Sequence, residues 1–191
     1  MDRRSFWNEV SKYGVLLGIS MGASKVFEQS LILGAGIGYA GWILLEWVLF
    51  AALFFAILYK ATKKRALSLD PALGFSFIQA LNYMILISIL AAIPVACINY
   101  VYINSIVGYG NYVDSLIAVV VNAAESQPLD SSSADMIEMV IDQLRAQPQS
   151  TIFSMLFGTI VQYAFAGLFA GLILAGFVSR KPEIFKQQDE Q

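Results

Sequence analysis

Four polar side chains inside otherwise apolar stretches are the residues best placed to do chemistry. Glu46 lies within the apolar stretch from Ile37 to Tyr59, and Lys25, Glu28 and Gln162 interrupt two further stretches. A charged group in such surroundings is costly unless it is paired or hydrated, which makes it a default candidate for function. At about 1.5 Å per helical residue, Glu46 and Gln162 each lie about 13 Å from the outer end of their stretch.

Three interpretations of this polar cluster stay open. Lys25 can reach down to Glu46 or pair with Glu28, three residues further along the same helix, so the cluster can be a structural ion pair. In that case Gln162 or Tyr163 supplies a hydrogen bond to it. In the second interpretation Glu46 is a site that responds to protons or cations, and in the third it is a surface position that extends to water.

The residue types that are missing exclude several kinds of catalysis. The chain has no histidine and a single cysteine, Cys97, so His-based dyads, Cys/His zinc sites and intrachain disulfides are ruled out. No phosphate-binding glycine loop and no metalloprotease motif occurs. We therefore expect no catalytic residues, no metal and no cofactor. A formal charge of −2 and a pI near 5.1 give no indication of nucleic-acid binding.

The composition places these residues in a membrane. Hydrophobic residues make up 58% of the 191 residues and charged residues 14%, whereas soluble domains have about 25% charged residues. A helix needs about 20 apolar residues to cross the hydrocarbon core. We predict one membrane domain over 1–191, an all-α, polytopic bundle of four transmembrane helices at about 10–31, 37–59, 75–104 and 152–178.

The distribution of basic residues predicts the orientation of this bundle. With a cytoplasmic amino terminus, only Lys25 and Arg145 lie outside, and the other ten of the 12 Lys and Arg residues lie inside. The inner residues include a basic cluster of Lys60, Lys63, Lys64 and Arg65. This asymmetry favours a multi-pass protein of an inner (cytoplasmic) membrane with both termini in the cytoplasm.

The segment 105–150, between the third and fourth spans, is predicted to be an acidic, helical, extracytoplasmic loop. Ser131 to Ser133 can cap a helix that ends before Pro148. Its apolar residues, Ile137, Val140, Ile141 and Leu144, gather on one side, and its charged residues on the other. The stretch from Tyr112 to Glu125 is also expected to be helical, as an outward continuation of the third span. These two helices either pack together and cap the bundle or provide a docking face for another subunit.

Small residues at steps of three or four residues predict where the spans touch, because lipid tails are as apolar as leucine and close contact drives helix association. The stripes comprise Gly14, Gly18 and Gly22, then Gly34, Gly38 and Gly41, then Ser88, Ala92 and Ala96, and finally Gly167, Gly171 and Ala175. We interpret them as contacts within a tight bundle. Contact with a second copy or a partner subunit is the alternative.

Several short motifs resemble those of a known family. They are Phe6-Trp7, Lys12-Tyr13-Gly14 with Gly18, the Lys63-Lys64-Arg65 turn, Gly74-Phe75-Ser76-Phe77 with Ala80, and Arg180-Lys181. Together with the acidic helical loop, they are similar to bacterial membrane proteins grouped as domain of unknown function 4199. The resemblance implies a four-span inner-membrane protein with no established activity. It also implies a candidate membrane partner, a polyprenyl-phosphate glycosyltransferase.

Two functional hypotheses from different classes follow. The first is a non-enzymatic scaffold or accessory subunit of a membrane assembly, indicated by the glycine stripes and the amphipathic outer helix. The alternative is a small transporter or channel that uses the intramembrane carboxylate of Glu46. A membrane enzyme acting on a lipid-linked substrate is less favoured, because the cytoplasmic side offers mostly lysine and arginine.

Overall fold

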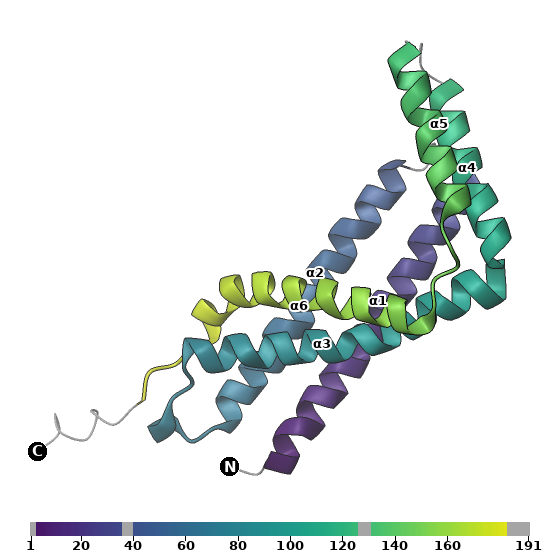
Figure 1. The fold of residues 1–191 in the computed structure, drawn as a ribbon. Coiled ribbons are helices and arrows are strands. Elements are labelled where there is room, and N and C mark those ends of the chain that lie inside the picture. The colour runs from purple at the N-terminus through teal and green to yellow at the C-terminus, as the bar shows by residue number, and fades with distance from the viewer. Residues whose placement is uncertain (1–2, 36–39, 126–130, 183–191) are drawn as a thin grey trace, which may run out of the picture.

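The computed structural model describes residues 3–35, 40–125 and 131–182, and these form helices without a β-sheet. The elements in chain order are α1 (Arg3–Ala35), α2 (Ala40–Ser68), the 3-10 turn η2 (Pro71–Leu73), α3 (Phe77–Val101), the π-helical η3 (Tyr102–Val107), α4 (Tyr109–Glu125), α5 (Ser131–Ala146) and α6 (Ile152–Val178). Figure 1 shows α3 and α6 lying side by side, with α1 and α2 crossing them as a second layer.

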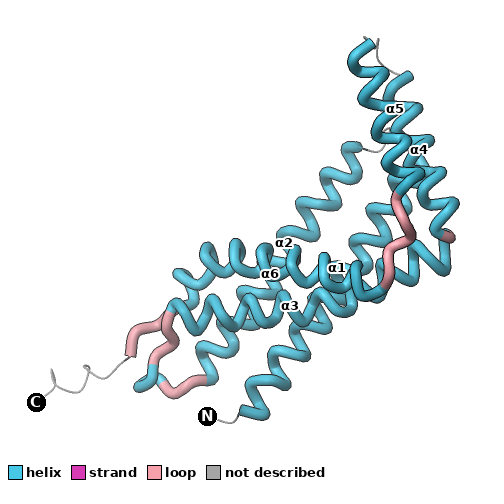
Figure 2. The backbone as a smooth tube through the Cα atoms, in the orientation of Figure 1, coloured by secondary structure: helices cyan, strands magenta, loops and turns pink. Residues whose placement is uncertain are grey.

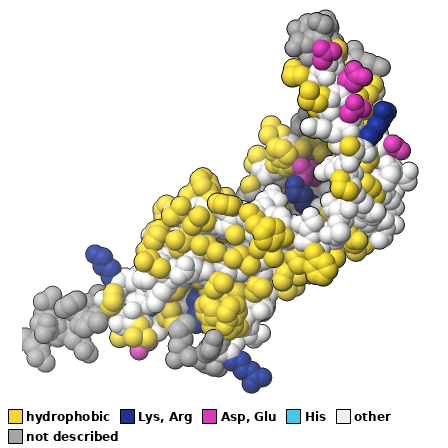
Figure 3. Space-filling view, in the orientation of Figure 1, with side chains coloured by type: hydrophobic (Ala, Val, Ile, Leu, Met, Phe, Trp, Pro, Cys, Tyr) yellow, Lys and Arg dark blue, Asp and Glu magenta, His cyan; other side chains and the backbone are white. Residues whose placement is uncertain are grey.

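Three of these helices are long and apolar enough to cross a membrane. They cover Gly41–Ser68, Phe77–Val107 and Ile152–Val178. α1 is long enough but is not among them, and Lys25 and Glu28 lie within its apolar stretch. The chain is thus an all-helical protein with three helices that could span a membrane, one fewer than the sequence predicted. Figure 3 shows a band of apolar side chains, with the charged side chains gathered toward its two ends.

The helix α3 is the centre of the bundle because α1 and α6 pack on it from two sides. A Cβ atom added to Gly18 would lie 2.5 Å from the carbonyl oxygen of Ala91 and 2.9 Å from Pro94. Gly14 meets Leu90 and Gly22 meets Ile98 in the same way. Since both sets of numbers increase together, α1 and α3 run parallel. The glycine stripe predicted in the first span therefore packs against α3.

The glycines of α6 make the corresponding contact on the other side of α3. A Cβ atom at Gly167 would lie 2.5 Å from the Ser88 hydroxyl, and one at Gly171 would lie 2.6 Å from Leu81. The numbering runs in opposite directions here, so α3 and α6 are antiparallel. Ala92 and Ala96 of α3 and Ala175 of α6 are also buried. Small residues thus allow three backbones to approach closely.

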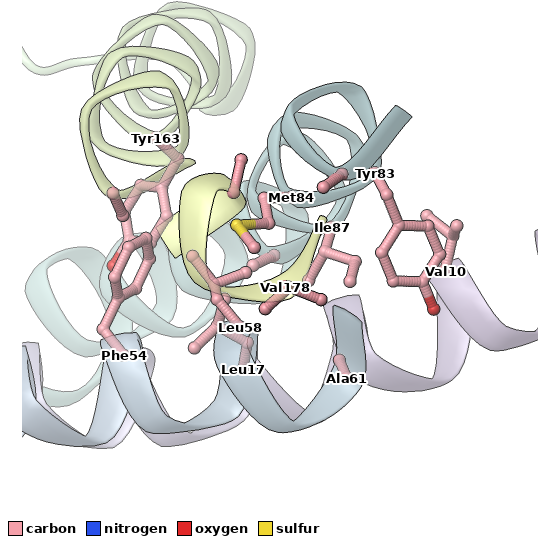
Figure 4. Packing of buried hydrophobic residues seen from close by; sticks show 14 of the residues in the cluster. Val10, Leu17, Phe54, Leu58, Ala61, Tyr83, Met84, Ile87, Tyr163 and Val178 are labelled. Carbon is pink, nitrogen blue, oxygen red and sulfur yellow. The ribbon is translucent and has the colours of Figure 1, made fainter. Parts of the chain in front are cut away.

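The stripe predicted at the start of the second span has no such role in the structure. Added Cβ atoms at Gly34 and Gly41 would meet nothing within 4 Å, and Gly38 lies outside the described residues. α2 is instead held through larger side chains. Figure 4 shows Phe54 of α2 facing Tyr163 of α6, while Leu58 points into the middle of the core.

The predicted basic turn at Lys63-Lys64-Arg65 is wrong, because α2 continues through it to Ser68. Lysine and arginine are good helix formers, so this basic stretch contains no stop signal. The helix is followed by Asp70, whose side chain accepts the amide of Ala72, and by Gly74 with φ +65°. The residues that end the helix therefore lie several positions after the basic residues.

Contacts at this end of the bundle tie together segments far apart in the sequence. Arg65 of α2 forms an ion pair with Glu9 of α1 at 3.1 Å. Arg180, just after α6, donates to the carbonyl oxygens of Ala66 and Leu69 and pairs through its backbone with Phe75. The start of α1, the end of α2 and the end of α6 therefore lie together.

The opposite end carries the α4–α5 hairpin, which extends away from the bundle (Figures 1 and 2). α4 is a separate helix and not the predicted continuation of the third span. The π-helical η3 ends at Gly108, whose φ of +83° turns the chain before α4 begins. Glycine adopts a positive φ at little steric cost, so Gly108 lets the chain change direction between η3 and α4.

The close contact between α1 and α3 gives a first prediction. Gly18→Ala should lower the free energy of unfolding by about 1–3 kcal/mol, because the new methyl group meets the Ala91 backbone and cannot be accommodated without a shift. Gly158→Ala, in the open middle of a helical stretch, is the matched control and should be neutral or stabilising by up to about 1 kcal/mol. Unfolding in mixed detergent micelles measures both, and equal effects would contradict this packing.

Candidate membrane-embedded polar site

Glu46 is buried where α1 and α2 meet, and its side chain has one partner. Only 3% of the residue is exposed, and its Oε1 accepts a short hydrogen bond from the hydroxyl of Ser24 on α1. Its second oxygen, Oε2, is buried and has no hydrogen-bond partner among the described residues. Burying an unpaired carboxylate oxygen is costly, so this position is either a structural tie or the place where a proton or cation is held.

The predicted partners of Glu46 are engaged elsewhere. Lys25 pairs with Glu28 at 2.7 Å, so the competing partner on its own helix holds it. Glu28 also accepts a hydrogen bond of 2.9 Å from the indole Nε1 of Trp47 on α2. Each carboxylate oxygen of Glu28 thus has one donor, which leaves each with a further lone pair that can accept a hydrogen bond. Two carboxylates therefore link the helices: Glu46 of α2 accepts from α1, and Glu28 of α1 accepts from α2.

Gln162 and Tyr163 lie in the same region without bonding to either carboxylate in the described parts of the chain. Both line a cavity of about 370 Å³ that α1, α2 and α6 enclose. Its polar wall contains Ser24, Lys25 and Glu28, and its other walls are mostly aromatic and aliphatic, from Phe50, Phe54 and Phe169. Volumes of this size with a few polar groups are typical of small-molecule sites.

Figure 3 shows acidic and basic side chains side by side in a hollow at the edge of the apolar band. Trp47 and Phe169, which both line the cavity, have 55% and 67% of their surface exposed. The cavity is therefore open to the surroundings of the bundle between α2 and α6, and not sealed in the core.

Neutral polar groups link α1 to α3 and η3 at the end of the bundle that carries the hairpin, and sequence reasoning did not single out these contacts. Gln29 donates to Asn99 at 2.8 Å, and the hydroxyls of Ser30 and Tyr102 are 2.8 Å apart. Further out, Gln149 donates to Asn104 at 2.7 Å. The only signal in the sequence is that these residues follow the apolar stretches, which is also true of ordinary interfacial residues.

The first turn of α4 lies near the ion pair. Burial raises the pKa of Tyr112 above its ordinary value of 10, and the negative charges of Glu28 and Tyr109 raise it further. An ionised phenol beside a carboxylate is unfavourable, which is why these charges act in this direction. α4 thus lies against α1 at the base of the projecting hairpin.

The predicted basic cluster divides into two kinds of residue. Lys60, Lys63 and Lys64 are exposed, and Lys63 lies over the ring of Tyr59. Arg65 is 5% exposed and is bound to Glu9, with its guanidinium over the ring of Phe6. Three of the four residues therefore face the surroundings, and the fourth is part of the helix packing.

The part of the chain that the structure describes contains no group of three or more Cys, Asp or Glu residues that could hold a metal ion. Cys97 is exposed and free. The described polar residues near the cavity form an ion pair within α1 and hydrogen bonds between α1 and α2.

No match to the chain is found among curated proteins or among solved structures. One family, described as "Protein of unknown function (DUF4199)", matches residues 12–180. The matched range starts within α1 and ends after α6, so it includes the polar site, the cavity and the α4–α5 hairpin. The chain belongs to this family, the proteins of unknown function DUF4199.

Proposed function

We propose that the chain is a four-span protein of the bacterial inner membrane with both termini in the cytoplasm. α1 is the fourth span, because its glycines lie against α3 and it must therefore cross at the same depth. Alternating directions support this threading, since α1 runs parallel to α3 and α6 runs antiparallel to it. The joined ends of α1, α2 and α6 carry most of the basic residues, which favours a cytoplasmic location for that end.

In this orientation, the chain acts as a non-enzymatic scaffold or accessory subunit of a membrane assembly. The observation that carries this proposal is the outer face of α5. Met136, Met139 and Val140 have 59%, 62% and 43% of their surface exposed, on a helix that packs on α4 and extends beyond the bundle. Exposed methionines on a projecting helix are typical of surfaces that bind other proteins.

The charges beside this face indicate what kind of partner fits it. Asp135, Glu138 and Asp142 are exposed on the same helix. A second copy of the chain would bring the same acidic residues into contact, and like charges disfavour that pairing. The fitting partner is a membrane protein with an apolar groove and basic residues at its rim. A polyprenyl-phosphate glycosyltransferase is the first partner to test, and a homo-oligomer is the other.

A second candidate function is a small transporter or channel, which the unpartnered Oε2 of Glu46 favours. It predicts that Glu46→Gln changes proton uptake or ion flux in proteoliposomes, because the titratable oxygen is removed while an acceptor for Ser24 is kept. The matched control is Glu138→Gln on the exposed face of α5. A Glu46→Gln trace that equals that of the control would remove this candidate.

Site-directed labelling tests the threading. In a Cys97→Ser background, a cysteine replacing Arg145 on α5, away from the Met136, Met139 and Val140 face, should react with a membrane-impermeant maleimide in intact spheroplasts. A cysteine replacing Lys63 on α2 should react only after lysis. Both positions are exposed in the structure, so accessibility depends on the side of the membrane alone. The reverse pattern would contradict the orientation, and labelling of both before lysis would contradict an odd number of crossings between them.

Photo-crosslinking in native membranes tests the scaffold proposal. A benzoylphenylalanine replacing Met139 should give one discrete adduct in stoichiometric yield, whereas the same group replacing Lys64, exposed at the opposite end of the bundle, should give little. Raising the salt concentration should lower the yield, since the rim charges are screened. An uncrosslinked chain at both positions, or equal yields from both, would count against a docking face on α5.

A further inference from the structure

The cavity between α1, α2 and α6 has a polar end and an apolar end. Along α2 it extends from Trp47 to Phe55, which corresponds to about 12 Å of helix. Lys25, Glu28 and Trp47 lie at the end nearest the α4–α5 hairpin, and Phe55 and Phe169 lie toward the other end. An elongated molecule with a polar head and an apolar chain matches this gradient.

This inference rests on the proposed threading, in which the surroundings of the cavity are hydrocarbon and not water. It opens beside Trp47 and Phe169, on helices that are each long and apolar enough to cross a membrane. α6 presents further exposed aromatic side chains on this face, among them Phe165 at 67%. The molecules present in bulk at such an opening are membrane lipids, which can enter sideways without leaving the bilayer.

The charges at the mouth narrow the choice of lipid. Lys25 and Glu28 place one positive and one negative group 2.7 Å apart, and the Lys25 side chain is 38% exposed. A head group with a phosphate and a protonated primary amine complements both, because the phosphate pairs with Lys25 and the ammonium donates to Glu28. A purely anionic head group meets the Glu28 carboxylate, and a quaternary amine has no N–H to donate.

We propose that this cavity binds a phospholipid whose head group carries a phosphate and a primary ammonium, with an acyl chain between α2 and α6 and the head group at Lys25 and Glu28. The site is separate from the docking face proposed on α5, and either can fail without the other.

Head-group contacts decide the selectivity of this site. The chain gains little from moving between the bilayer and the cavity, since both are apolar. A hydrogen bond to a charged group is roughly twice as strong as one between neutral groups, so the preferred lipid should be enriched by roughly tenfold over the others.

The test uses the full chain in nanodiscs containing equal amounts of phosphatidylethanolamine, phosphatidylcholine and phosphatidylglycerol, with native mass spectrometry of the lipids that stay bound after release. Wild type should retain phosphatidylethanolamine with roughly tenfold enrichment. Glu28→Gln should lose the preference over phosphatidylcholine. Ala51→Phe should fill the cavity and lose bound lipid, whereas Ala56→Phe, an equal change on α2 outside the cavity lining, should behave as wild type.

Equal retention of the three lipids by wild type would overturn the proposal, as would a preference for phosphatidylglycerol. Equal lipid retention by Ala51→Phe and Ala56→Phe would also overturn it, since the lipid would then be bound elsewhere on the surface. If Glu28→Gln does not fold, this matched alanine pair and the wild-type selectivity still decide the question.

Discussion

The structure depends on close backbone contact between α3 and its two neighbours. In a bilayer, burying an apolar side chain against another helix replaces equally apolar lipid, so association depends on contact distance. Gly18 on one side of α3 and Gly167 on the other bring their helices so near that even a methyl group would collide. These two contacts fix the directions of α1 and α6 relative to α3, and with them the ends of the bundle.

α2 lacks such a contact, and the cavity is the consequence. Its glycine at position 41 faces open space, and its exposed side includes Trp42, Leu44 and Val48. Larger side chains hold α2 at a distance from α6, which leaves room between them. In the first half of α2, hydrogen bonds from Ser24 to Glu46 and from Trp47 to Glu28 take the place of glycine contacts. Buried carboxylates can therefore serve packing here, as the structural interpretation of the cluster requires.

The family, the helical class and the three most apolar spans could be predicted from the sequence, because they depend on composition and on uncharged stretches such as 71–113. The end of α2 at Ser68 could not be predicted in this way, because basic residues such as Lys63 and Lys64 indicate a membrane boundary and not the end of a helix. The sequence predicts either Glu28 or Glu46 as the ion-pair partner of Lys25. It does not decide between them, because the decision depends on how deep α1 lies beside α2. The role of Gly34 and Gly41 was wrong because a stripe of small residues shows that contact is allowed, not that a neighbour is there.

Polar contacts hold the end of the molecule that carries the α4–α5 hairpin, whereas close backbone contact holds the centre of the bundle. Most of the stability of a protein helix comes from packing, so α4 and α5, with 17 and 16 residues, depend on each other and on contacts at the base of the hairpin. Tyr109 donates to the carbonyl of Gln147 at the base of the hairpin, and Gln149 reaches Asn104 in η3. α5 uses Ile137, Ile141 and Leu144 against α4, which leaves Val140 of the predicted apolar face exposed together with Met136 and Met139. These polar contacts anchor the hairpin at its base, and the side chains facing α4 hold its two helices together. The exposed surface of Met136, Met139 and Val140 is therefore not needed for the packing of the hairpin.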